Sequence, residues 1–96
     1  MAAYLIVDQL EVTDPDTMKE YAKGVAATVA AHGGRMLVRG GAFEVVEGDW
    51  TPRRVIVLEF PDMDALKAWY DGPDYAGLKK MRLASSRSNA VMVEGV

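Results

Sequence analysis

The segment Arg54-Val55-Ile56-Val57-Leu58-Glu59-Phe60 is the strongest β-strand pattern in the chain. One face of such a strand carries Ile56, Leu58 and Phe60, and the other face carries Val55 and Val57. An antiparallel sheet with one face in water alternates apolar with polar residues, whereas here both faces are apolar. The segment therefore predicts a strand that is covered on both sides.

The first strand, predicted over Ala3–Leu10, has the same property. Leu5 and Val7 lie on one side of it, and Tyr4 and Ile6 lie on the other. The helices that the chain predicts are enough to cover one face of a four-stranded sheet but not two. We therefore expect a homodimer in which the sheets of two copies pack face to face.

The first helix is predicted from its capping signals and its apolar spacing. Asp14 and Pro15 form a helix start, since a carboxylate accepts from free backbone N–H groups and proline suits the first turn. An apolar stripe follows at spacings of three and four residues, and the helix ends at His32-Gly33-Gly34. A strand over Met36–Arg39 comes next, broken by Gly40-Gly41 and resumed over Ala42–Val46.

The second half of the chain predicts two helices and a closing strand. Pro61-Asp62 starts a helix that contains Trp69 and Tyr70, and Gly72-Pro73 breaks it and starts a third helix over Asp74–Ala84. A last strand is predicted over Asn89–Glu94. The order β-α-β-β-α(α)-β is that of the ferredoxin-like arrangement, an α+β fold with a four-stranded antiparallel sheet. We expect a single domain over residues 1–96.

Composition excludes several classes of site. The 96 residues include no cysteine and one histidine, so disulfides, thiolate metal sites and multi-histidine metal sites are excluded within one chain. Glu47 and Asp49 are too few ligands for a divalent cation, and we expect neither metal nor cofactor. The net charge of −3 disfavours nucleic-acid binding. The sequence predicts no targeting signal and no membrane span, so we expect a cytoplasmic protein.

Several short motifs resemble, in order and spacing, the family catalogued as domain of unknown function 1330. They are Tyr21-Ala22-Lys23, Gly33-Gly34-Arg35, Val38-Arg39-Gly40-Gly41, Glu47-Gly48-Asp49-Trp50, Pro52-Arg53-Arg54-Val55, Glu59-Phe60, Ala68-Trp69-Tyr70, Pro73-Asp74-Tyr75 and Val93-Glu94-Gly95-Val96. The resemblance runs from about Ala3 to Val96. One departure is Gly72, where the family pattern leads us to expect a serine.

The resemblance implies a fold and an assembly more than a function. The family is similar to the dimeric α+β barrel superfamily, in which ferredoxin-like subunits pair through their sheets. This implied homodimer agrees with the face pattern of the two strands. Relatives in that superfamily include cofactor-free monooxygenases, haem-degrading enzymes, muconolactone isomerases and stress proteins.

Three charged residues in or beside apolar strands are candidates for chemistry: Arg39, Arg54 and Glu59. A buried lone charge is costly, so each residue is either paired or at the edge of a water-filled cleft. One interpretation is an Arg–Glu network that holds the sheet or the dimer. The other makes the arginines anchors for a ligand carboxylate or enolate, with Glu59 as a proton acceptor.

Aromatic and basic residues have two interpretations as well. Trp69, Tyr70 and Tyr75 are either core or the aromatic wall of a ligand pocket. His32 is either a residue that closes the first helix or a general base. The basic run Lys79, Lys80, Arg82 and Arg87 is interpreted as a solvated helix end.

Two functional hypotheses remain open. The first is a dimeric protein that binds a small anionic or aromatic molecule in a cleft between sheet and helices, with cofactor-free proton transfer or oxidation as its chemistry. The second is a non-catalytic dimeric module, stress-related or structural, whose charges are scaffold. The sequence does not decide whether the protein is an enzyme.

Overall fold

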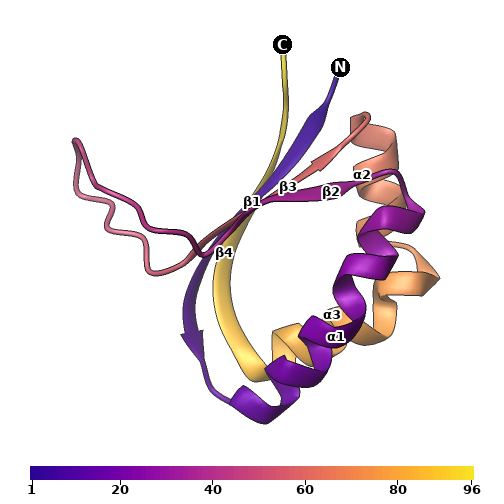
Figure 1. Cartoon of the computed structure of the whole chain (residues 1–96), viewed down its shortest axis with the longest axis horizontal. Helices are drawn as coiled ribbons and strands as arrows, with labels where there is room; N and C mark the ends of the chain where they lie inside the picture. The colour runs from indigo at the N-terminus through magenta and orange to yellow at the C-terminus, as the bar shows by residue number, and fades with distance from the viewer.

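The computed structural model describes residues 1–96 as one antiparallel sheet with three helices on one side (Figure 1). The strands lie in the order β2-β3-β1-β4, and the predicted α+β ferredoxin-like fold is confirmed. In chain order the elements are β1 (Ala3–Val12), α1 (Pro15–Ala31), β2 (Arg35–Arg39), β3 (Val55–Phe60), α2 (Met63–Tyr70), α3 (Pro73–Ser85) and β4 (Ser86–Glu94). None of the helices is long and apolar enough to cross a bilayer.

Aspartate caps begin the first two helices. The carboxylate of Asp14 accepts from the backbone N–H and the hydroxyl of Thr17, and that of Asp62 accepts from the backbone N–H of Ala65 at 2.7 Å. Each cap satisfies a donor that the first helical turn leaves free. His32 is the C-terminal cap residue of α1, at the predicted end of that helix.

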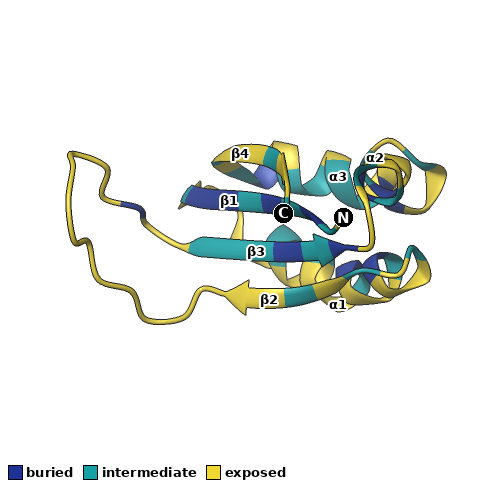
Figure 2. Cartoon of the chain, turned by 90° about the horizontal axis from the view of Figure 1, so that it is seen from above, coloured by how far each residue is buried: buried dark blue, intermediate teal, exposed yellow.

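One predicted strand is absent. Residues 41–46 have no strand partner and belong to a long connection that extends away from the sheet, which we call the arm (residues 41–53; Figure 2). Gly40 has φ +67° and donates its N–H to the carbonyl of Val55, after which the chain leaves the sheet. A φ in the left-handed region favours glycine, so the glycine pair ends β2 instead of kinking it. The last strand also begins at Ser86, three residues before the predicted Asn89.

The inner face of the sheet, which the helices cover, becomes more polar from one end to the other. Phe60 and Ala3 pair at one end, and the next row across the strands is Met36, Leu58, Leu5 and Met92. A third row contains Arg39, Ile56, Val7 and Ala90, and beyond it Gln9 pairs with Ser88. The apolar end of this face therefore packs into a core, while the polar end does not.

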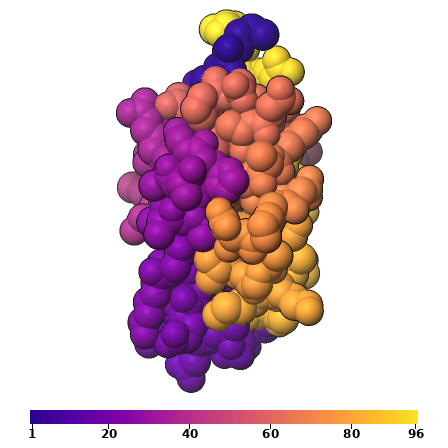
Figure 3. All heavy atoms as spheres, turned by 90° about the vertical axis from the view of Figure 1, so that its right-hand side faces the viewer, coloured from indigo at the N-terminus to yellow at the C-terminus, as the bar shows by residue number.

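The core is built around two stacked aromatic rings. The rings of Trp69 and Tyr75 lie 4.0 Å apart between centroids, and Phe60 contacts Trp69 at 5.3 Å. All three side chains are buried, and the indole N–H of Trp69 donates to the hydroxyl of Thr28. This cluster joins α2 and α3 to α1 and to β3, and Figure 3 shows the three helices packed together on this side of the molecule.

The outer face carries an unbroken apolar row across all four strands. Val38 pairs with Val57, Val57 with Ile6, and Ile6 with Val91. Val91 is 55% exposed, and no helix covers this face. The flanking rows mix polar and apolar residues: one contains Arg35, Glu59, Tyr4 and Val93, and the other contains Val55, Asp8 and Asn89.

Replacing Gly34 with alanine should destabilise the fold. The added Cβ would lie 2.6 Å from a ring carbon of Phe60, a buried core residue that has no free space to enter. Overpacking of this kind costs about 1–3 kcal/mol. Gly41→Ala is the matched control, because a Cβ there meets nothing within 4 Å. Urea unfolding should rank Gly34→Ala well below Gly41→Ala, and equal stabilities would contradict the close contact.

Candidate functional site

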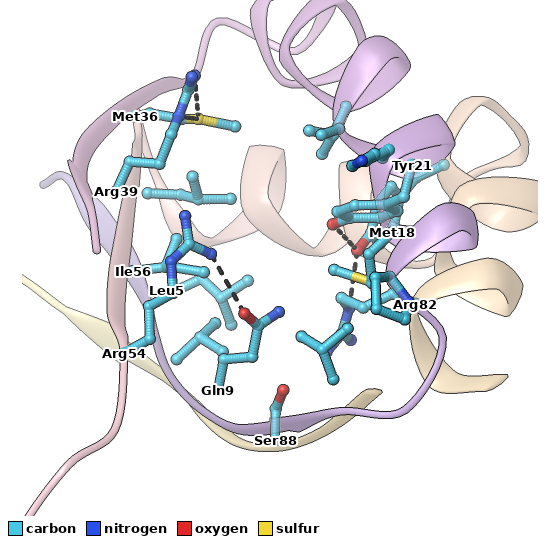
Figure 4. Close-up of a pocket in the computed structure, with 18 of the residues that line it drawn as sticks. Leu5, Gln9, Met18, Tyr21, Met36, Arg39, Arg54, Ile56, Arg82 and Ser88 are labelled. Atoms are coloured by element: carbon cyan, nitrogen blue, oxygen red, sulfur yellow. Dashed lines mark hydrogen bonds between the residues drawn. The ribbon is translucent and has the colours of Figure 1, made fainter. Parts of the chain in front are cut away.

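A cavity of about 480 Å³ lies between the polar end of the inner sheet face and helices α1 and α3 (Figure 4). Its apolar walls come from both layers, with Leu5, Val7, Ile56 and Leu58 on the strands and Met18, Ala22 and Val25 on α1. The apolar residues of α1 therefore lie in two different surroundings, the core and the cavity. Val29 at its C-terminal end is core, whereas the residues nearer Asp14 line the cavity.

The charged residues that line the cavity are all cationic. Arg39 comes from β2, Arg54 precedes β3, Arg82 lies on α3 and Lys19 lies on α1. No aspartate or glutamate is among the lining residues, although the chain as a whole has a net charge of −3. None of the three arginines forms an ion pair with a carboxylate. No carboxylate therefore lies within ion-pair distance of these arginines, of which Arg39 and Arg54 are exposed to solvent and Arg82 is half-buried.

Arg54 and Arg39 lie at the sheet side of the cavity. The guanidinium of Arg54 donates to the side-chain carbonyl of Gln9 at 3.2 Å, and that of Arg39 contacts the sulfur of Met36. The Ser88 hydroxyl oxygen lines the same side, is buried and has no hydrogen-bond partner. The N–H groups of the two guanidiniums and the Ser88 hydroxyl are therefore only partly hydrogen-bonded, and only to uncharged partners.

Adjacent residues of β1 hold the segment Arg53-Arg54 in place. In the plane of the sheet, the backbone N–H of Gln9 donates to the carbonyl of Arg54 at 2.9 Å. On the outer face, the buried Asp8 carboxylate accepts from the backbone N–H of Arg53 and from the indole N–H of Trp50, both at 2.9 Å. These two hydrogen bonds, the indole one foremost, hold the pKa of Asp8 below its ordinary value.

Gly40 gives the Arg54 side chain its space. A Cβ at this position would collide with Nε of Arg54, and the positive φ of Gly40 disfavours any other residue as well. Gly40 of the diglycine is therefore needed for the position of the Arg54 side chain.

The helical side of the cavity holds a hydrogen-bonded chain. The hydroxyls of Tyr21 and Tyr75 lie 2.7 Å apart, and Nε of Arg82 donates to the Tyr75 oxygen at 3.1 Å. Arg82 is half-buried here, so its interpretation as part of a solvated helix end is wrong. It lies seven residues after Tyr75 and so shares a helix face with it, a spacing that could have revealed its position.

The structure brings four of the predicted ligand-binding residues to the cavity: Arg39, Arg54, Trp69 and Tyr75. Tyr70 does not line it, and instead its ring and carbonyl contact Lys79. The sequence interpretation missed Tyr21, Arg82 and Gln9. Gln9 was detectable as the polar member of the series Leu5, Val7, Gln9 on one strand face.

The two predicted proton-transfer residues lie outside the cavity. Glu59 is on the outer face, where it accepts from Nε of Arg35 at 2.8 Å, and this bond lowers the pKa of Glu59. The expected Arg–Glu network therefore does not involve Arg39 or Arg54. His32 lies 3.2 Å from Asp74 at the end of α1. No cluster of three or more His, Cys, Asp or Glu side chains suited to a metal ion occurs.

Comparison with known proteins identifies one family and a set of similar folds. The family described as domain of unknown function 1330 matches residues 2–96. A protein of unknown function from Rhodopseudomonas palustris superposes with a TM-score of 0.74 and 14% identity, over 99% of this chain and 82% of the other. No curated protein matches the sequence.

Two further structures extend the comparison. A dimeric ferredoxin-like protein of unknown function from Jannaschia has a TM-score of 0.68 and 20% identity, over 99% of this chain and 100% of the other. SnoaB, a cofactor-independent oxygenase from Streptomyces nogalater, has a TM-score of 0.66 and 16% identity, over 99% and 92%. At these identities the likeness concerns the fold.

The hydrogen bonds that Asp8 accepts from Trp50 and Arg53 predict a pH-dependent stability. Because the pKa of Asp8 is lowered on folding, its contribution is complete above the ordinary aspartate pKa of about 4 and is lost as the pH falls through the lower, folded value. Asp8→Asn should therefore lower the melting temperature at pH 7 and converge with the wild type in acid. Asp49→Asn is the control, because it removes a carboxylate from the arm and leaves the bonds of Asp8 in place. A gap between Asp8→Asn and wild type that is constant with pH would contradict the prediction.

Proposed function

Since the chain belongs to the family described as domain of unknown function 1330, we propose a function for it from its own cavity: it is a homodimeric protein that binds a small organic acid. The observation that carries the proposal is the cationic lining. Three arginines without carboxylate partners face an apolar space, and an anionic ligand would supply the missing counter-charge.

The arginines favour a planar anion. Guanidinium groups donate in a fixed fork that matches a carboxylate or an enolate at two points. Arg39 is the last residue of β2 and Arg54 directly precedes the neighbouring strand β3, and both reach the cavity from its sheet side (Figure 4). A carboxylate placed there would receive charge-assisted hydrogen bonds while the body of the ligand stays in the apolar part.

The apolar walls favour an aromatic or similarly flat body. The buried ring of Trp69 forms part of the lining, and its N–H is already bonded to Thr28. It can therefore offer a ligand only apolar and stacking contact. The cavity volume of about 480 Å³ is within the ordinary range for small-molecule sites.

The homodimer is supported by the outer sheet face. An apolar row of Val38, Val57, Ile6 and Val91 without a helix over it is the kind of surface that a second copy would bury. The Jannaschia protein, with the same fold, is a dimer. The flanking ion pair of Arg35 and Glu59 would lie toward the rim of such an interface.

The proposal extends to cofactor-independent chemistry on the bound acid. SnoaB, which shares the fold, is an oxygenase of that kind. In this chain the groups at the cavity that carry a hydroxyl or ammonium proton are the side chains of Tyr21, Tyr75, Ser88 and Lys19, whereas Glu59 and His32 lie elsewhere. A non-catalytic module whose arginines are scaffold is the alternative, and it predicts an arginine–carboxylate network that this cavity lacks.

Acid recognition can be tested with matched ligands. Titration calorimetry of the wild type measures binding without changing Trp50, whose indole donates to Asp8. Benzoate should bind saturably and benzamide should not. Arg39→Leu and Arg54→Leu should each weaken benzoate binding about 10- to 100-fold, the range expected for loss of a hydrogen bond to a charged group.

The control variant is Arg87→Leu, which removes an arginine that lies outside the cavity and pairs with Glu11 at the surface. It should bind benzoate as the wild type does. Equal responses to acid and amide, or equal losses in all three arginine variants, would contradict the proposal.

Sedimentation equilibrium tests the dimer. The wild type should have twice the chain mass of 10.5 kDa at micromolar concentration. Val91→Lys places a charge in the apolar row at an exposed position, so it should yield a folded monomer. Leu83→Lys, at an exposed position on α3, should remain dimeric. A monomeric wild type would overturn this part of the proposal.

A further inference from the structure

The tyrosine pair at the helical side of the cavity has one hydroxyl proton more than it uses. Tyr21 and Tyr75 together carry two hydroxyl protons, and the bond between them uses one. The only other hydrogen bond of either hydroxyl is accepted by Tyr75, from Arg82. One phenolic proton is therefore available to a further acceptor.

Arg82 decides which tyrosine presents that proton. A guanidinium only donates, so the Tyr75 oxygen acts as acceptor toward Arg82. A hydroxyl that accepts from a cation becomes a better donor, which favours Tyr75 donating to Tyr21. The chain of donors then runs from Arg82 through Tyr75 to Tyr21, and the proton of Tyr21 is the free one.

The surroundings of Tyr21 support a donor role. It lies on α1, is half-buried and lines the cavity, whereas Tyr75 is 1% exposed and enclosed by the core. Burial raises the pKa of Tyr21 above its ordinary value, so the hydroxyl stays protonated. No carboxylate or backbone carbonyl of the chain accepts from it.

This donor faces the arginines across the cavity. Figure 4 shows Arg39 and Arg54 on the sheet side and Tyr21 with Arg82 on the helical side, with apolar residues between them. The space is thus polar at two opposed ends. A ligand held by one carboxylate at the sheet side would bring its far end to the tyrosines.

We infer that the cavity is built for a two-ended ligand, a flat acid that carries a carbonyl or enolate oxygen opposite its carboxylate, and that Tyr21 donates a hydrogen bond to this oxygen. The inference rests on the proposed acid binding and adds to it a substrate class and a specificity-determining residue. Arg82 acts through Tyr75 as a positioning residue, and its charge favours an oxygen on which negative charge accumulates.

Two nearly isosteric acids distinguish the contribution of the tyrosine end of the site from that of the arginine end. Para-acetylbenzoate carries a carbonyl oxygen where para-isopropenylbenzoate carries a methylene group of similar shape. Titration calorimetry of the wild type should give roughly five- to tenfold tighter binding of the acetyl acid, the range of one net hydrogen bond. This comparison needs no substitution and does not depend on how a variant folds.

Tyr21→Phe should remove the preference. Its affinity for para-isopropenylbenzoate should stay near that of the wild type, while para-acetylbenzoate loses its advantage. Tyr75→Phe should reduce the preference partly, because Tyr21 keeps its hydroxyl but loses the link to Arg82. Tyr70→Phe is the matched control, since Tyr70 does not line the cavity and should leave the ratio unchanged.

The outcomes distinguish this inference from the proposal beneath it. If neither acid binds, acid recognition itself is wrong and the inference falls with it. If both acids bind the wild type equally, the cavity binds acids but has no second polar end, and only the inference is overturned. If Tyr21→Phe still prefers para-acetylbenzoate, another group binds the carbonyl oxygen and the role inferred for Tyr21 is wrong.

Discussion

The stack of Trp69 on Tyr75 fixes where the helical layer meets the sheet, and the rest of the molecule follows from that position. Together with Phe60 the two rings fill the space between the layers at one end of the inner face. Beyond them the strand positions are occupied by Gln9, Arg54 and Ser88, which do not form an apolar core. Leucine or valine at these positions would bury more apolar surface. Polar residues where the sheet pattern favours apolar ones are typical of functional sites. The core and the cavity therefore occupy opposite ends of the same space between the sheet and the helices.

The fold was largely accessible from local patterns because its strands and helix caps follow them. The double-sided apolar pattern of Arg54–Phe60 and the aspartate caps each have a local physical cause. The segment 42–46 was predicted as a strand and is not one. Its residues favour a strand, but a strand also needs a neighbour to accept its hydrogen bonds, and the positive φ of Gly40 turns the chain away from β3. Whether a segment pairs with a neighbouring strand depends on the whole sheet and cannot be predicted from that segment alone.

The site was accessible only in part, for a related reason. Arg39 and Arg54 stand out as charges beside apolar strands, and Trp69 and Tyr75 stand out as aromatic residues at a helix break. The partner of Glu59 could not be predicted, because its identity as Arg35 depends on the register between β2 and β3. The interpretation of Arg82 is wrong because it belongs to a run of basic residues whose other members do not line the cavity. Spacing along α3 from Tyr75 separates Arg82 from Lys80 but not from Lys79, which lies four residues after Tyr75.

Gly40 shows that the chemistry of a site constrains positions that no ligand touches. Its hydrogen atom lies where any side chain would push against the guanidinium of Arg54. A substitution there would leave every lining residue unchanged and still redirect the charge on which the proposed acid binding depends. Gain or loss of binding within a lineage could therefore arise from one codon outside the pocket, and a redesign of the cavity for another ligand would have to treat this backbone position as part of the pocket.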